Sequence, residues 1–173
     1  MTTAGPTTAT TQVYRVYIKA TPQAIWDAIT KPEWTERYGY GGRGEYDLRP
    51  GGAYRGYTSV GMRAAGAPDL AIDGEIVEAE PPWRLVQTWR MVMDEAMAAE
   101  GFTRLTYEIK EGGTGVSRLT VTHELASTPR LAVLMSGGME DEGAGGGWSW
   151  VLSSLKTLLE TGSEIQFQPS RPD

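Results

Sequence analysis

Two side chains of this sequence could move protons in an otherwise apolar setting. His123 is the one histidine of the chain, and Tyr107 lies in an earlier apolar segment. An imidazole titrates near neutral pH and can act as a general acid or base, and a phenol can donate a hydrogen bond or a proton. Three interpretations of His123 stay open: a neutral core residue bonded to Tyr107 or to a backbone carbonyl, a ligand contact, or a proton-transfer residue.

Other reactive combinations find no support in the sequence. The chain has no cysteine, and no Gly-x-Ser-x-Gly motif accompanies His123. The sequence therefore contains no recognisable nucleophilic triad. Asp94 and Glu95 are chain neighbours that point apart, which makes them a poor acid–base pair. The acidic stretches 73–75 and 78–80 do not match a calcium loop, and one histidine cannot form a histidine-rich metal site. We therefore expect no metal and no cofactor.

Glycines crowd the segment 137–147, just before a helical pattern. A nucleotide-binding loop would need a strand leading directly into it or a Gly-Lys-Ser/Thr sequence, and neither is present. Asp141 and Glu142 would also repel a phosphate. We interpret the segment as a hinge and hypothesise that it flexes as a gate beside the following helix.

Length and charge narrow the class of protein. A chain of 173 residues is typical of one domain, and its net charge of −6 without a run of Lys or Arg disfavours nucleic acid and anionic membranes as partners. The first residues lack the features of a signal peptide, and no stretch has the apolar length of a membrane span. We expect a soluble cytoplasmic protein with a flexible arm over 1–11, a single domain over 12–162 and a polar tail over 163–173.

Hydrophobic periodicity predicts the elements that must position these side chains. A strand over 12–20 precedes two short helices, which begin at Thr21-Pro22 and at Pro32. About six antiparallel strands follow, joined by short turns rich in glycine and proline, with a loop around 63–68. The last segment is a long amphipathic helix whose apolar stripe must lie on the sheet, and this stripe comprises Trp148, Val151, Leu152, Leu155, Leu158 and Leu159. Trp150 falls on the opposite side, where it either packs against the arm or tail or forms a partner interface.

Period-two alternation assigns the strand residues that face the helix. The inward sets are Leu119, Val121, His123 and Leu125; Leu105, Tyr107 and Ile109; and Leu85, Gln87, Trp89, Met91 and Met93. Apolar walls with a few isolated polar groups are typical of ligand pockets, and aromatic residues from the short helices and early strands could form the mouth. The predicted ligand-binding residues are Trp34, Tyr38, Tyr54, Tyr57, Gln87, Trp89, Met91, Tyr107, His123, Trp148 and Leu152. His123 and Tyr107 are the weak catalytic candidates.

Five stretches in this order resemble one family. They are "YRVYIKATPQAIWDAITKPEWTERY", "RPGGAYRGY", "DGEIVEAEPPWRLVQTWR", "LTVTHEL" and "GGGWSWVLSSLKTLLE". Over about residues 12–162 the chain resembles the Hsp90-ATPase-activator-homologue group of the START/Bet v 1-like helix-grip superfamily. The resemblance implies an α+β fold: a curved antiparallel sheet of about six to seven strands around a long C-terminal helix, two short helices after the first strand, and a cavity between sheet and helix.

The resemblance leaves three functions open. The leading hypothesis is binding of a small hydrophobic or aromatic molecule in the cavity, without catalytic machinery. The first alternative is a polyketide cyclase- or aromatase-like enzyme in which His123 or Tyr107 moves protons on a substrate folded by the same cavity. The second is a co-chaperone or interaction module tied to the stress response, in which Trp150 and the acidic surface meet a chaperone or a second copy of the chain in a homodimer.

Overall fold

The computed structural model of the protein describes residues 11–165. The expected N-terminal arm therefore lies outside the described residues except for Thr11, which begins the first strand. Of the expected tail, 163–165 are described and the rest lies outside.

The described residues form one seven-stranded sheet in the order β1-β7-β6-β5-β4-β3-β2, and each neighbouring pair is antiparallel. Because consecutive strands from β2 to β7 are neighbours, the sheet is a meander, and β1 adds to its far edge beside β7. The strands are β1 Thr11–Ile18, β2 Gly44–Tyr46, β3 Ala53–Tyr57, β4 Leu70–Glu80, β5 Arg84–Met91, β6 Thr103–Glu111 and β7 Ser117–Glu124.

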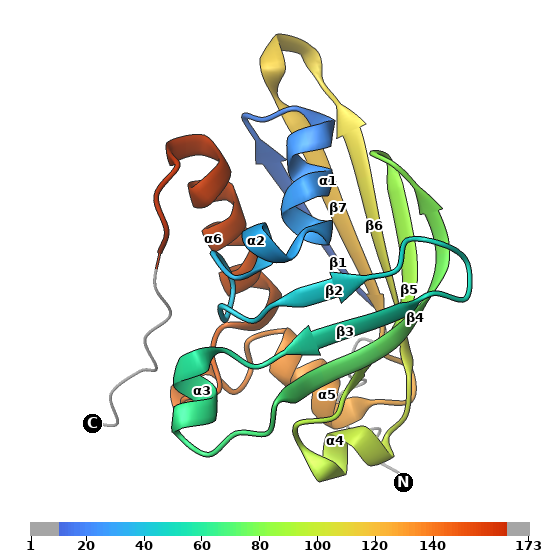
Figure 1. Ribbon diagram of the computed structural model, residues 1–173, viewed down its shortest axis with the longest axis vertical. Helices are drawn as coiled ribbons and strands as arrows, with labels where there is room; N and C mark the ends of the chain where they lie inside the picture. The colour runs from blue at the N-terminus through green and yellow to red at the C-terminus, as the bar shows by residue number, and fades with distance from the viewer. Residues whose placement is uncertain (1–10, 166–173) are drawn as a thin grey trace, which may run out of the picture.

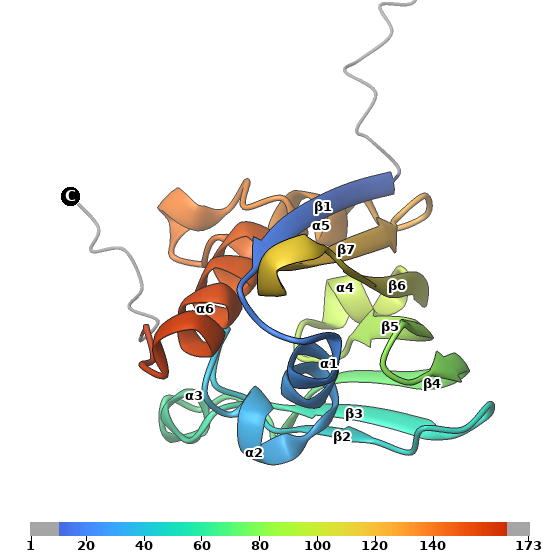
Figure 2. The ribbon, with the colours of Figure 1, turned by 90° about the horizontal axis from the view of Figure 1, so that it is seen from above.

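Helices cover the concave side of the sheet. Figure 2 shows the strands curving from β1 round to β2, with α1 and α6 inside the curve and α2 beside the ends of β2 and β3. The helices are α1 Pro22–Thr30, α2 Pro32–Thr35, α3 Val60–Ala64, α4 Glu95–Ala99, α5 Pro129–Met135 and α6 Gly147–Thr161, with 3₁₀ turns at Gly113–Gly115 and Glu140–Glu142. The expected helix-grip architecture is confirmed.

Local sequence explains where α1 and α6 lie. The Thr21 side chain caps α1 by accepting a hydrogen bond of 3.1 Å from the Ala24 N–H, and Pro22 occupies the first turn. In α6 the predicted stripe buries Trp148, Leu152, Leu155 and Leu158 against the sheet, while Val151 and Leu159 are half-buried. The removal of this apolar surface from water is the main force that holds α6 in the curve.

Three short helices were not predicted, and they gather at one end of the sheet (Figure 1). The first, α3, extends into the expected loop at 63–68. Each is too short for a helical period to stand out. Local capping marks two of them: at α3 Ser59 accepts from the Met62 N–H at 3.2 Å, and at α4 Asp94 accepts from the Met97 N–H at 2.9 Å. The Glu100 carboxylate accepts from the Arg130 N–H at 3.0 Å, which ties the start of α5 to the end of α4.

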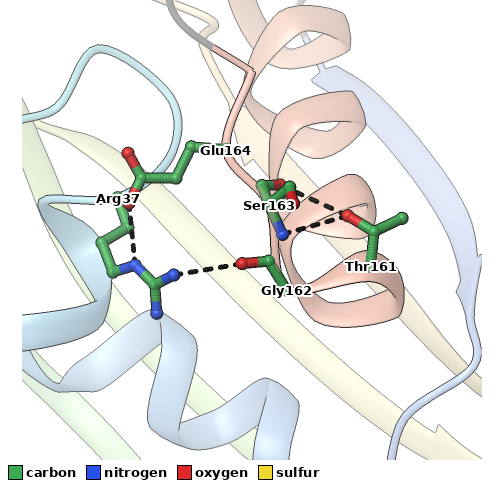
Figure 3. A network of polar contacts seen from close by, with 5 residues as sticks. All are labelled: Arg37, Thr161, Gly162, Ser163 and Glu164. Carbon is green, nitrogen blue, oxygen red and sulfur yellow. Dashed lines mark hydrogen bonds and ion pairs between the residues drawn. The ribbon is translucent and has the colours of Figure 1, made fainter.

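The loop after α2 is attached to α6 at two places. The Trp150 indole N–H donates to the Gly39 carbonyl at 2.8 Å, and the Gly39 N–H donates to Ser154 Oγ at the same distance. Trp150 is therefore half-buried and has a partner within the domain that the sequence did not indicate. At the other place Arg37 reaches past the end of α6, donating to the Gly162 carbonyl at 3.3 Å and to the Glu164 carboxylate at 2.8 Å (Figure 3).

Candidate functional site

A cavity of about 520 Å³ lies between α6 and the concave face of the sheet. Small-molecule pockets are typically about 300–1,000 Å³, so the space is large enough for a compact ligand. It is bounded at the end where α3, α4 and α5 gather, and the loop before α6 forms part of its wall. Residues from both the sheet and the helices form the wall. They are Ile29 from α1, Tyr46 from β2, Tyr54 from β3, Ile72 from β4, Trp89 and Met91 from β5, Met97 from α4, Tyr107 from β6, Met135 from α5, and Trp148 and Val151 from α6.

Methionine is concentrated on this wall. The chain has seven methionines, and the six within the described residues all line the cavity: Met62, Met91, Met93, Met97, Met135 and Met139. Methionine is unbranched and polarisable, so it can adapt to ligands of different shape. The three unpredicted helices supply Met62, Met97 and Met135, which explains why much of this lining was missed from the sequence.

Six tyrosines line the cavity, and four of them have deeply buried hydroxyls: Tyr38, Tyr46, Tyr54 and Tyr107. Burial raises the pKa of each hydroxyl, to about 12 for Tyr54 and well above the usual value for Tyr46 and Tyr107. All four therefore keep their protons at neutral pH and can serve as hydrogen-bond donors.

The hydroxyls of this group differ in how their protons are used. Tyr38 donates to the Ala28 carbonyl at 3.0 Å. The Tyr54 hydroxyl lies near the Tyr46 hydroxyl and the Trp89 indole, and these neighbours offset part of the rise in its pKa that burial causes. Among the described residues, no group accepts a hydrogen bond from the Tyr54 or the Tyr107 hydroxyl.

His123 is fully buried behind the cavity wall, and both of its ring nitrogens are engaged. The Trp148 indole N–H donates to Nδ1 at 3.2 Å, so Nε2 carries the proton and donates to Thr103 Oγ1 at 2.7 Å. Thr103 in turn donates to the Trp89 carbonyl at 2.7 Å. Burial lowers the pKa of His123 to about 4, so the ring is neutral under ordinary conditions.

Charged groups on the wall are few and lie at its exposed edge. Arg43 is exposed and is held 3.1 Å from the Glu45 carboxylate, with its guanidinium 4.8 Å from the centre of the Tyr57 ring. Asp94 is the carboxylate among the described lining residues, and one of its oxygens caps α4. The interior of the cavity is therefore apolar with uncharged phenols.

The structure separates the predicted site residues into two groups. Seven of the eleven line the cavity: Tyr38, Tyr54, Tyr57, Trp89, Met91, Tyr107 and Trp148. That they contact a ligand stays a prediction. Tyr46 was missed, although alternation along its short strand was the signal that could have found it.

The other four predicted residues do not lie on this wall. His123 bonds Thr103 and Trp148 rather than Tyr107 or a backbone carbonyl. Gln87 is fully buried among apolar neighbours, and neither atom of its amide has a partner among the described residues. Trp34 lies under Arg37, whose guanidinium is 5.3 Å from the ring centre, and Leu152 belongs to the packed core.

The described residues contain neither a membrane-spanning helix nor a cluster of metal ligands. None of the helices between residues 11 and 165 has the length and apolar character needed to span a bilayer. Within the same residues, no three side chains of His, Cys, Asp or Glu are grouped so that they could hold a metal ion.

Sheet, helix and cavity together define a helix-grip protein. The sequence matches the family model described as "Activator of Hsp90 ATPase homolog 1-like protein" over residues 19–160, and the chain belongs to this family. None of the curated proteins matches the chain.

Solved structures share the fold at low identity. CalU16 from Micromonospora echinospora is 22% identical, with a TM-score of 0.54 over 75% of this chain and 69% of that one. An HSP90 activator from Plasmodium falciparum is 20% identical, with a TM-score of 0.52 over 68% of this chain and 74% of that one. DynU16, a protein in the dynemicin biosynthetic locus, is 19% identical, with a TM-score of 0.60 over 91% of this chain and 50% of that one.

Proposed function

We propose that the protein binds a small hydrophobic or aromatic molecule in the cavity between α6 and the sheet. The observation that carries the proposal is the cavity itself: about 520 Å³ of space inside the domain, lined by aromatic rings and six methionines. Transfer of an apolar molecule from water to such a surface is favourable by roughly 25 cal/mol for each Å² of apolar area buried.

The state of His123 favours a binding role over the cyclase-like alternative. A general base must reach the proton that it removes, and its lone pair must be available. The Nδ1 lone pair of His123 already accepts from Trp148, and the ring lies behind the wall. The phenols on the wall are held in their protonated form by burial, so they supply donors rather than a base.

The family and its neighbours are compatible with this proposal. DynU16 belongs to a biosynthetic locus, and by analogy the present cavity would suit a small organic molecule rather than a macromolecule. The interaction-module alternative assigns Trp150 and the acidic surface to a partner, and of these the Trp150 indole N–H is bonded to Gly39 inside the domain.

A fluorescence titration with N-phenyl-1-naphthylamine tests the proposal. This uncharged probe becomes brighter in apolar surroundings, and we expect a saturable increase with the wild-type protein. Ala144→Trp places a large ring on the cavity wall and should raise Kd about ten-fold or more, equivalent to about 1.4 kcal/mol.

Ala126→Trp is the matched control, because Ala126 is exposed and lies off the wall. It should bind the probe as the wild type does. Circular dichroism and thermal unfolding check that both variants fold. No saturable binding by the wild type, or equal affinities of the two folded variants, would count against the cavity as the binding site.

A further inference from the structure

We infer that the cavity selects uncharged ligands with a carbonyl oxygen, and that this oxygen accepts hydrogen bonds from Tyr54 and Tyr107. The inference rests on the proposed function and specifies the ligand's chemistry. It starts from two phenol protons that face the cavity and have no acceptor among the described residues.

The groups beside the Tyr54 hydroxyl carry protons of their own. They are the Tyr46 hydroxyl and the Trp89 indole. An indole N–H can only donate a hydrogen bond, so it cannot accept the Tyr54 proton. The Tyr46 and Tyr54 rings also lie against each other, with centres 4.5 Å apart, which restricts how the hydroxyl can move.

A glycine makes room for the Tyr54 hydroxyl. A Cβ atom added at Gly56 would lie 2.9 Å from the Tyr54 oxygen and 3.3 Å from the Ile72 Cβ. Any larger residue at position 56 would displace the hydroxyl, so the glycine is what allows the Tyr54 hydroxyl to lie there. The Tyr46 ring packed against Tyr54 limits the movement of this donor before a ligand arrives, which reduces the entropy lost on binding.

Tyr107 approaches the same region from the opposite half of the sheet. Its ring is held edge-on to Trp148, with centres 6.1 Å apart, and it lies on β6 whereas Tyr54 lies on β3. Both side chains line the same cavity. A carbonyl oxygen has two lone pairs and can accept two hydrogen bonds.

The scarcity of charged groups on the wall is the reason that we expect an uncharged ligand. A buried charge is costly unless an opposite charge pairs with it. The lining cation among the described residues, Arg43, is exposed and already paired with Glu45, so it offers little to a carboxylate ligand. Asp94 is exposed as well and caps α4, so it offers little to an amine.

Three compounds with one ring system test the inference: 9-fluorenone, fluorene and fluorene-9-carboxylate. The first carries a carbonyl group, the second lacks it, and the third carries a negative charge. Binding is measured by displacement of N-phenyl-1-naphthylamine. The wild type should bind fluorenone at least about five-fold more tightly than fluorene, because hydrogen bonds to the carbonyl replace those to water, and should bind the carboxylate most weakly.

Removal of single hydroxyls locates the donors. Tyr54→Phe and Tyr107→Phe should each lower the preference for fluorenone over fluorene about two- to ten-fold, and the double variant should abolish it. Affinity for fluorene itself should change little, since only an oxygen atom is lost. Tyr14→Phe is the matched control, because the Tyr14 hydroxyl bonds Gln12 and lies off the wall.

The outcomes separate this inference from the proposed function. Equal binding of fluorenone and fluorene by the wild type, or a preference that survives in the double variant, overturns the inference and leaves ligand binding standing. Carboxylate binding as tight as that of fluorenone overturns the requirement for an uncharged ligand. Displacement of the probe by none of the three compounds counts against the proposed function and the inference together.

Discussion

Burial of His123 determines which protonation state the fold can tolerate. The ring lies between Trp89 and Trp148, with centres 5.3 and 6.0 Å away, and its two nitrogens complete a hydrogen-bonded chain from α6 to β5. A proton on Nδ1 would face the Trp148 N–H, so protonation would break this chain as well as bury a charge. We therefore interpret His123 as a structural link between α6 and the sheet.

This interpretation predicts how stability depends on pH. The pKa of His123 is lowered to about 4 in the folded protein and is about 6.5 in the unfolded chain, so the unfolded state binds the proton first as pH falls. The His123 contribution to stability should be complete above pH 6.5 and should be lost as pH falls from 6.5 to 4, by about 3 kcal/mol in total.

Urea unfolding of the wild type and His123→Asn across this pH range measures the effect. Asparagine keeps polar atoms at the position but does not titrate, so the variant should be less stable at pH 7 and its stability should fall less steeply with pH. Parallel pH profiles for the two proteins would show that His123 is not the group responsible.

At the scale of elements, the glycine-rich segment before α6 allows close packing between α5 and α6. Gly147 begins α6 with a left-handed φ of +63°, and a Cβ there would lie 2.3 Å from the Met135 carbonyl of α5. The Gly147 N–H donates to the Tyr40 hydroxyl at 3.1 Å. These contacts set the angle between α5 and α6, and the gate hypothesis for 137–147 stays a prediction.

Two alanine substitutions distinguish the cost of overlap with neighbouring atoms from the cost of a left-handed backbone conformation. Gly147→Ala should lower the free energy of unfolding by about 3 kcal/mol or more, because the new Cβ would overlap backbone atoms that cannot move independently. Gly143→Ala is the control: its φ of +85° is also left-handed, but a Cβ there meets open space, so it should cost about 1–2 kcal/mol. Equal losses in urea or thermal unfolding would contradict the packing argument.

The strands and the long helix were predictable because each repeats a pattern over many residues. Alternation along β6 and β7 placed Tyr107 and His123 on the inner face correctly. The helices α3 and α4 depend on single caps and α5 on contacts such as that with Glu100, and none of these leaves a periodic signal. Which inward residues reach the cavity depends on how these helices close it, so Gln87 and Tyr107 could not be distinguished from the sequence.

At the scale of the whole molecule, the fold is a sheet curved too strongly for α6 to fill the space inside it. The core packs tightly where α1 and α6 cover the sheet, and the cavity lies where loops and short helices close the remaining end. A wall of methionines around a few fixed phenols combines an adaptable surface with directional donors. Such a site can accept related molecules that share one polar feature.

The most direct test of ligand binding uses the methionines of the wall. With the methionine methyl groups labelled with ¹³C, the signals of Met62, Met91, Met93, Met97, Met135 and Met139 can be assigned by single Met→Leu variants and followed by NMR during titration with N-phenyl-1-naphthylamine. The account predicts that most of these six signals shift together and saturate with one Kd. Probe binding that leaves them unmoved, or no binding at all, would contradict a ligand site inside the curve of the sheet.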